Sequence, residues 1–398
     1  MRMIAVALAV VCLRAQTALP PDLDSLAKIR ARMLFNLAHQ PNYTCVETIE
    51  RSARPKLTGK LKIIDTLRLE VALVDGRELF AWPGSKKFED TDVTQMVTTG
   101  AIGNGNFGIH AQALFGSRAA TFHYIGEEDF QGKKAIRFDY NVPQMLSGYH
   151  IRVSAASAVV GYHGSFYADP ATFDMERIEV MADDLPPTLM LASTNDKIDY
   201  AVARIGDGDF LLPSQSELSM VGLTGREEHN QVKFTSCRQF SGESVLTFDD
   251  APANKPDAAP IPTREFDAPG GLDVMLVIVK DVDFRTAAVG DPVMARVDHD
   301  VKQKGVVIIP KGATATGRIT RLEQYETSTI LGVEFPEIEA PGILARMKGN
   351  LMHSVGFEPP RPRQGMRMHS PPLPGEGIIA LPATQHRMSK GCMMFWRT

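Results

Sequence analysis

A glycine-rich segment is the first place where the residue types could do chemistry. Residues 103–108 read Gly-Asn-Gly-Asn-Phe-Gly, which formally matches the GxGxxG pattern of dinucleotide-binding proteins. That pattern holds a pyrophosphate only where it follows a buried parallel strand and opens a helix. The preceding residues, 92–102, are short and polar, and the flanking patterns predict antiparallel strands. We therefore interpret the segment as a loop before a short helix at 109–116, and we expect no nucleotide and no other cofactor.

Histidine and acidic side chains are further candidates for acid–base chemistry or metal binding. His150 and His163 fall in neighbouring predicted strands and could face each other, and Asp298 and Asp300 would share one face of a strand. Paired carboxylates can hold a cation or transfer a proton, but they more often form a solvated surface. The sequence contains no HExxH and no GxSxG motif. It thus predicts no metal site and no catalytic residue, while a hydrolase assembled from distant residues stays open.

The chain has four cysteines, at positions 12, 45, 237 and 392. Cys45 and Cys237 lie in an early and a late predicted strand of the same domain, and we predict that they form a disulfide. Cys392 would then be a lone thiol, and three buried free thiols are the alternative. No CxxC pair is present, so a zinc site is not expected.

The first residues, 1–20, have the pattern of a secretory signal peptide. Arg2 gives a positive start, residues 3–13 are an unbroken apolar run, and Arg14 ends the run before small residues. Such a run is too short to cross a bilayer, which needs about 20 residues. A buried core helix is the alternative interpretation. We expect an exported protein, periplasmic or extracellular, with no transmembrane span in the mature chain.

Composition narrows the classes of protein further. The 398 residues are 44% hydrophobic, which is typical of a globular chain of about two domains. Lys and Arg together number 43 and Asp and Glu 47, for a net charge of −4. A chain so balanced has no overall basic field, so nucleic acid is not expected as a partner.

Residues 22–40 have the periodicity of one amphipathic helix, with Asp24 or Ser25 as its cap and Pro41 at its end. The strand patterns begin at residue 43, and Asp75-Gly76 is a strong hairpin signal. The apolar stripe of the helix recurs at spacings of three and four. Its members are Leu26, Ile29, Met33 and Leu37.

These patterns divide the chain into parts. Residues 21–249 predict an α+β domain that is mostly antiparallel β, a curved half-barrel sheet with one early helix. Residues 250–270 are rich in proline and predict an extended linker. Residues 271–398 predict a small all-β barrel or sandwich, interrupted by a Pro- and Arg-rich insertion at 356–377.

Residues 164–180 read GSFYADPATFDMERIEV, with Asp169-Pro170 at a turn between two strands. Together with the early helix and the long meander, this resembles the half-barrel of periplasmic lipoprotein carriers and outer-membrane lipoprotein-sorting proteins. The resemblance implies that the concave sheet face holds acyl chains and that the helix partly plugs it. The residues that would line the ligand are Leu26, Ile29, Met33 and Leu37.

The C-terminal part carries a second resemblance. Gly290-Asp291-Pro292-Val293, then residues 309–313 and Gly317-Arg318, are similar to the β-barrel of conjugation and type IV secretion envelope proteins. The two-part layout resembles exported proteins of acidobacterial type.

The sequence as a whole predicts a non-enzymatic, exported cell-envelope protein whose first domain binds a lipid or another apolar ligand. One alternative is an interaction scaffold with a dry core, which would have an envelope protein as its partner. A hydrolase with a dispersed site is the second alternative.

Overall fold

The computed structural model describes residues 20–85, 87–88, 93–97, 108–153, 156–240, 263–357 and 371–398. Several predictions fall wholly or mostly outside these residues. They are the signal peptide with Cys12, the glycine motif apart from Gly108, most of the linker at 250–270 and most of the insertion at 356–377.

Helix α1 (Pro21–His39) matches the predicted helix within one residue at each end. The prediction of Asp24 or Ser25 as its cap is wrong, because the N-cap is Pro20 and no side chain caps the helix. Pro21 suits the first helical position, since its fixed φ is helical and it has no N–H to satisfy. Asp24 instead lies in the first turn, where a negative charge stabilises the helix dipole.

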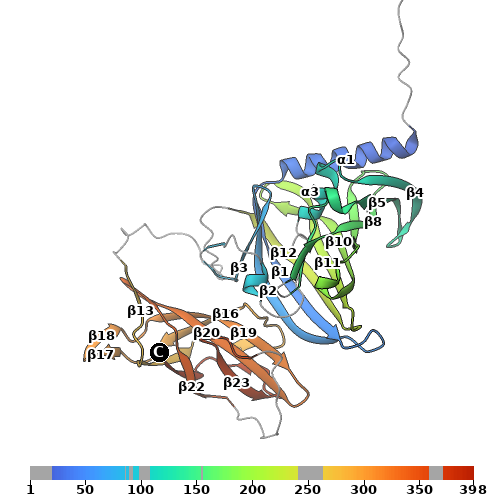
Figure 1. Ribbon diagram of the computed structural model, residues 1–398. Coiled ribbons are helices and arrows are strands. Elements are labelled where there is room, and N and C mark those ends of the chain that lie inside the picture. The colour runs from blue at the N-terminus through green and yellow to red at the C-terminus, as the bar shows by residue number, and fades with distance from the viewer. Residues whose placement is uncertain are drawn as a thin grey trace, which may run out of the picture.

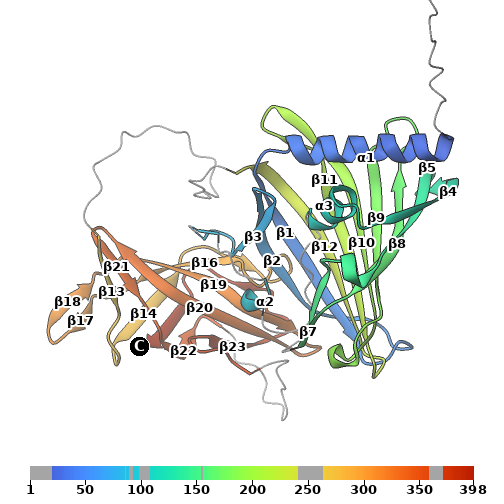
Figure 2. The ribbon, with the colours of Figure 1, turned by 45° about the horizontal axis from the view of Figure 1, so that its top comes forward.

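Ten antiparallel strands form one curled sheet, in the order β3-β2-β1-β12-β11-β10-β9-β8-β5-β4. Figure 2 shows the sheet bent into a half-barrel, with α1 lying across one end of the strands and α3 (Ile109–Gly116) on the concave side. The expected α+β half-barrel with one early helix is confirmed. The strands are β1 (Tyr43–Arg54), β2 (Lys62–Val74), β3 (Arg77–Ala81), β4 (Thr121–Phe130), β5 (Lys133–Val142), β8 (Gly161–Ala168), β9 (Met175–Asp183), β10 (Leu191–Ile205), β11 (Gly208–Gly222) and β12 (Glu227–Gln239).

Short elements complete this part of the chain. Strands β6 (His150–Val153) and β7 (Ala156–Val159) form a separate hairpin, and α2 (Val93–Met96) is a single helical turn after β3. The helix expected at 109–116 is α3. The 3-10 turns η1 (Gln144–Leu146) and η2 (Pro187–Leu189) lie in the loops before β6 and β10.

The strands that come first and last in the chain, β1 and β12, pair with each other inside this sheet. The predicted disulfide joins Cys45 on β1 to Cys237 on β12 and is confirmed, and Cys392 is a buried free thiol. The hairpin at Asp75-Gly76 is also confirmed, because both residues have the positive φ that this tight turn requires.

The C-terminal part is all-β. One sheet contains nine strands, and all its pairs are antiparallel except β13 with β21. Strand β13 falls inside residues 250–270, so this piece of the expected linker belongs to the second sheet. The strands are β13 (Arg264–Asp267), β14 (Asp273–Ile278), β16 (Pro292–Val297), β19 (Thr314–Gln324), β20 (Ser328–Ala340), β21 (Ile343–Arg346), β22 (Asn350–Val355), β23 (Gly377–Pro382) and β25 (Met393–Arg397).

Two small strand pairs flank this sheet. They are β15 (Val282–Asp283) with β24 (Arg387–Met388), and β17 (Val301–Gln303) with β18 (Val306–Ile309). The expectation that Asp298 and Asp300 share one strand face is wrong, because both lie in the turn between β16 and β17. Asp300 accepts a hydrogen bond from the Lys311 backbone N–H at 2.8 Å, which is a turn-stabilising contact.

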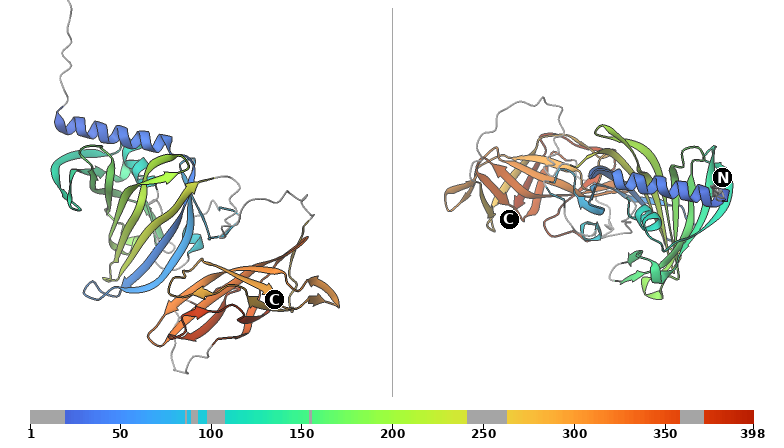
Figure 3. Two further views of the ribbon diagram at one scale, coloured as in Figure 1. Left: turned by 180° about the vertical axis from the view of Figure 1, so that it is seen from behind. Right: turned by 90° about the horizontal axis from the view of Figure 1, so that it is seen from above.

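The two sheets meet at the free edge of β2, beyond the end of its pairing with β3 (Figure 1). Val289 forms an isolated parallel bridge there, donating to the Thr66 carbonyl and accepting from the Arg68 N–H, both at 2.8 Å. The Arg68 guanidinium also donates to Asp291 at 2.6 Å. One hydrophobic cluster contains residues from both sheets, including Leu67, Val289 and Ile319. The two parts are therefore packed against each other rather than only tethered, as the view from behind in Figure 3 shows.

Gly290 sets how closely the two sheets approach. A Cβ atom at this position would lie 2.3 Å from the Arg68 carbonyl oxygen and 2.7 Å from the Trp82 ring. Its φ of +101° also disfavours an L side chain. The Arg318 guanidinium lies 4.6 Å from the centre of the same Trp82 ring, a cation–π contact across the junction.

We predict that Gly290→Ala separates the two sheets locally and lowers the free energy of unfolding by about 2 kcal/mol or more. The added methyl group must displace backbone atoms of β2, which cannot yield cheaply. Gly305→Ala is the matched control, because Gly305 also has positive φ (+83°) but nothing lies within 4 Å of the added Cβ. Urea unfolding would measure the free energy of unfolding of both variants and so separate the effect of the clash from that of backbone strain. An equal loss of unfolding free energy in both variants would contradict the prediction.

We also predict that the double variant Cys45→Ala/Cys237→Ala is less stable by up to roughly 5 kcal/mol. The disulfide closes a sequence separation of 192 residues, and the chain-entropy model assigns a loop of this length that upper value. Thermal melting with and without a thiol reductant would measure the loss. Reductant should lower the Tm of the wild type and leave the Tm of the double variant unchanged.

Candidate ligand site in the half-barrel

The concave face of the half-barrel carries a row of large apolar side chains. Phe138 on β5 lies directly opposite Phe166 on β8, which lies opposite Ile178 on β9. Residues directly opposite each other in antiparallel strands point to the same face. All three are buried, and the Phe138 and Phe166 rings stack with centroids 5.3 Å apart.

Two helices cover this row. Ile29 and Met33 of α1 belong to the same hydrophobic cluster as the sheet residues, together with Leu114 and Phe115 of α3. The Phe115 ring meets the Phe166 ring edge to face at 5.3 Å. An antiparallel sheet with one apolar face must bury it against another element, and here α1 and α3 do so.

The structure brings the four residues predicted to line a ligand onto one side of α1. Ile29 and Met33 are fully buried in the cluster, whereas Leu26 and Leu37 are partly buried against it. Their contact with a ligand stays a prediction. In the structure these side chains contact the sheet and α3.

Polar contacts hold α1 in place at its middle and near its C-terminal end. The Asn36 side chain donates to the Leu211 carbonyl at 2.7 Å and accepts from the Leu211 N–H at 3.0 Å. Arg30 donates to the backbone carbonyls of Phe115 and Ser117, both at 3.0 Å. Side-chain hydrogen bonds thus add to the apolar contact of α1, joining it to β11 and to the end of α3.

A buried polar group lies beside the apolar row. Asp196 on β10 faces Val180 on one neighbouring strand and Leu218 on the other, so it points to the concave side. It is 2% exposed, and its Oδ1 atom has no hydrogen-bond partner among the described residues. His110 of α3 places Nε2 3.9 Å from Asp196 Oδ2, and the Tyr149 ring packs edge to face on His110.

Burial controls the protonation of these groups. Desolvation raises the pKa of Asp196 to about 7 and lowers the pKa of His110 to about 4. Between about pH 4 and pH 7, both side chains are therefore favoured in their neutral forms. Glu47 on β1 also points to the concave face, and burial together with the nearby Glu78 raises its pKa to about 8.

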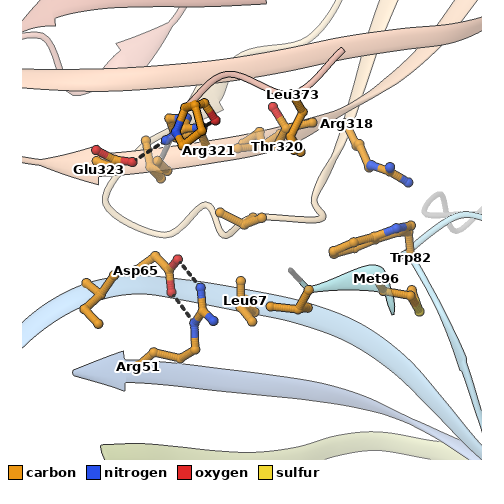
Figure 4. A pocket seen from close by; sticks show the side chains of 16 residues that line it. Arg51, Asp65, Leu67, Trp82, Met96, Arg318, Thr320, Arg321, Glu323 and Leu373 are labelled. Atoms are coloured by element: carbon orange, nitrogen blue, oxygen red, sulfur yellow. Dashed lines mark hydrogen bonds and ion pairs between the residues drawn. The ribbon is translucent and has the colours of Figure 1, made fainter. Parts of the chain in front are cut away.

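A cavity of about 210 Å³ lies where β1 and β2 face β19. Leu67, Trp82 and Met96 contribute apolar walls to it, and Leu373 lies on the side of the second sheet. Figure 4 shows two ion pairs on opposite walls, Arg51 with Asp65 at 2.6 Å and Arg321 with Glu323 at 2.6 Å. Because these charges are already paired within the protein, the cavity presents little net charge to a ligand.

The remaining histidine candidates do not assemble a site. The expectation that His150 and His163 face each other is wrong, because His150 pairs with Val159 in the separate β6–β7 hairpin. His163 Nδ1 lies 2.6 Å from Asp183 Oδ1 on the neighbouring strand β9 and is half exposed. Among the described residues, no cluster of three His, Cys, Asp or Glu side chains could hold a metal ion.

Sequence reasoning did not single out Asp196 or Glu47. A signal was present, since Asp196 is two residues before Ile198 in a strand and alternation places both side chains on one face. Recognising it required knowing which face of that strand is buried.

Comparisons with known proteins found distant similarity to solved structures. No family model matches the chain, and no curated protein matches it. A domain described as that of an outer membrane lipoprotein-sorting protein from Vibrio parahaemolyticus is 10% identical, with a TM-score of 0.28, and the match covers 56% of this chain and 93% of that one. A DUF1329 family protein from Desulfovibrio piger is 11% identical, with a TM-score of 0.31, covering 58% and 98%.

The resemblances of the C-terminal part to conjugation and type IV secretion proteins, and of the layout to acidobacterial proteins, stay predictions. Within the described residues, no helix is both long and apolar enough to cross a membrane.

The buried Asp196 carboxyl predicts a pH-dependent stability difference between the wild type and Asp196→Asn. A carboxyl with a raised folded-state pKa binds its proton more tightly in the folded protein, so its ionisation destabilises the fold as pH rises. The asparagine variant lacks this penalty. It should be more stable than the wild type by about 2 to 4 kcal/mol at pH 8, and the advantage should decline towards zero near pH 4.

Urea unfolding of both proteins between pH 4 and pH 8 would measure this difference. The comparison isolates Asp196, because Glu47 and His110 are present in both proteins. A difference that does not change with pH would contradict the prediction.

Proposed function

We propose that this protein is a non-enzymatic, exported cell-envelope protein whose half-barrel binds a lipid or another apolar ligand on its concave face. The observation that carries the proposal is the cluster between α1, α3 and the sheet. Its aromatic and aliphatic side chains form a continuous apolar surface, and α1 covers part of it through a few side-chain contacts. Displacing α1 would expose this surface to an acyl chain, which gains about 0.8 kcal/mol for each CH₂ group that it buries.

Export is supported by two observations of different kinds. The N-terminal sequence has the pattern of a secretory leader, and Cys45 and Cys237 form a disulfide, which persists in oxidising compartments. The division into a half-barrel at 21–249, a linker at 250–270 and an all-β domain at 271–398 belongs to the same proposal, with β13 at the end of the linker range joining the second sheet.

An interaction scaffold with a dry core is the second candidate, favoured by the complete burial of Ile29 and Met33 within the cluster. Uptake of the neutral apolar probe 1-N-phenylnaphthylamine by the purified protein would separate the two. Saturable fluorescence enhancement, together with a co-purifying lipid in native mass spectrometry, supports ligand binding. Failure of both would leave the scaffold.

We predict that Asn36→Ala accelerates uptake of this probe about tenfold. The substitution removes two of the three side-chain hydrogen bonds to the Leu211 backbone and leaves the one that Gln40 donates. A loss of roughly 1.4 kcal/mol from these two raises the population with α1 displaced tenfold. Leu34→Ala on the exposed side of the same helix is the control and should leave the rate unchanged. Stopped-flow fluorescence would measure both rates, and equal rates would exclude α1 as the moving cover.

A further inference from the structure

One oxygen of the Asp196 carboxyl indicates the kind of polar group that the half-barrel can accept. The carboxyl interacts with the Lys197 backbone N–H, but its buried Oδ1 atom has no hydrogen-bond partner among the described residues. It lies on the same face as the apolar row, next to Val180, which belongs to the cluster that α1 covers. On its other side, Leu218 on β11 lies directly opposite Asp196, and the buried Asn230 on β12 lies opposite Leu218. A buried polar atom without a partner costs free energy that a ligand hydrogen bond would recover.

The surrounding groups leave this position without a strong positive charge. The one ion-pair partner that the described residues give Asp196 is His110, at 3.9 Å, and its imidazole is held neutral by burial. Arg51 lies on the same face but donates two hydrogen bonds to Asp65, at 2.8 and 2.6 Å. An anionic head group would therefore lose its hydration without gaining a cation.

A cationic head group is disfavoured for a related reason. It would need an ionised carboxylate at Asp196, and complete burial opposes that ionisation. A neutral head group with hydroxyl or amide hydrogens avoids both the desolvation of a charged group and the ionisation of Asp196. Its O–H or N–H can donate to Asp196 Oδ1, and Thr194 and Tyr149, which share a hydrogen bond beside it, supply further polar atoms.

We propose that the half-barrel selects neutral amphiphiles, molecules with an apolar chain and a hydroxyl- or amide-bearing end that hydrogen-bonds to Asp196, over fatty-acid anions and cationic amphiphiles. This inference rests on the proposed function, because it assumes that the apolar chain occupies the concave face.

The test compares three ligands with the same dodecyl chain length: 1-monolaurin, laurate and dodecyltrimethylammonium. Each would displace 1-N-phenylnaphthylamine from the full-length protein at pH 6.5, below the micelle concentration of each ligand. We expect monolaurin to bind at least tenfold more tightly than laurate or the cation. Equal affinities, or tightest binding of either charged ligand, would overturn the inference.

Asp196→Leu then tests the residue. It should lower the affinity for monolaurin about tenfold while 1-N-phenylnaphthylamine still binds, which also shows that the variant is folded. Asp199→Asn is the matched control, since Asp199 lies on the opposite face of the same strand, paired with Arg177 at 2.6 Å. An unchanged preference in Asp196→Leu would overturn the role of Asp196. Failure of the wild type to bind the apolar probe would instead count against the proposed function.

Discussion

The structure depends on one constraint, which is that a strongly curved sheet cannot bury its concave face by itself. Ten strands give this face a row of aromatic and aliphatic residues, centred on Phe138 and Phe166. Helices α1 and α3 supply the missing layer, with Ile29 and Met33 as the main contribution of α1. The position of the early helix, the candidate ligand site and the burial of Asp196 all follow from this need for a cover.

The sequence predicted those parts of the fold that local patterns determine. The spacing of Ile29 and Met33 defined the buried face of α1, and Asp75-Gly76 defined a hairpin, because both signals act over a few residues. The Cys45–Cys237 pair was also predictable, since an oxidised chain with one early and one late strand cysteine has few alternatives. In the structure the two bridged strands, β1 and β12, also pair along their length, which the sequence analysis did not predict.

What the sequence did not predict is set by contacts between distant segments. Val289 adds to the edge of β2 through backbone atoms, which carry no residue-type signal. Gly290 lies against Trp82, and a side chain is excluded there only because these two distant segments pack together in the structure. The chemistry at Asp196 was likewise hidden, because an isolated aspartate in a strand is most often solvated, and its burial depends on α3.

The pairing of the two end strands has a consequence for how the molecule reaches its final form. The disulfide joins strands separated by 192 residues, so β1 must wait for β12 before its edge is covered. Contacts of such long range form slowly, and an uncovered strand edge is prone to pair with other chains. Until the last strand of the half-barrel has formed, the first strand therefore has an open edge that favours misassociation with other chains.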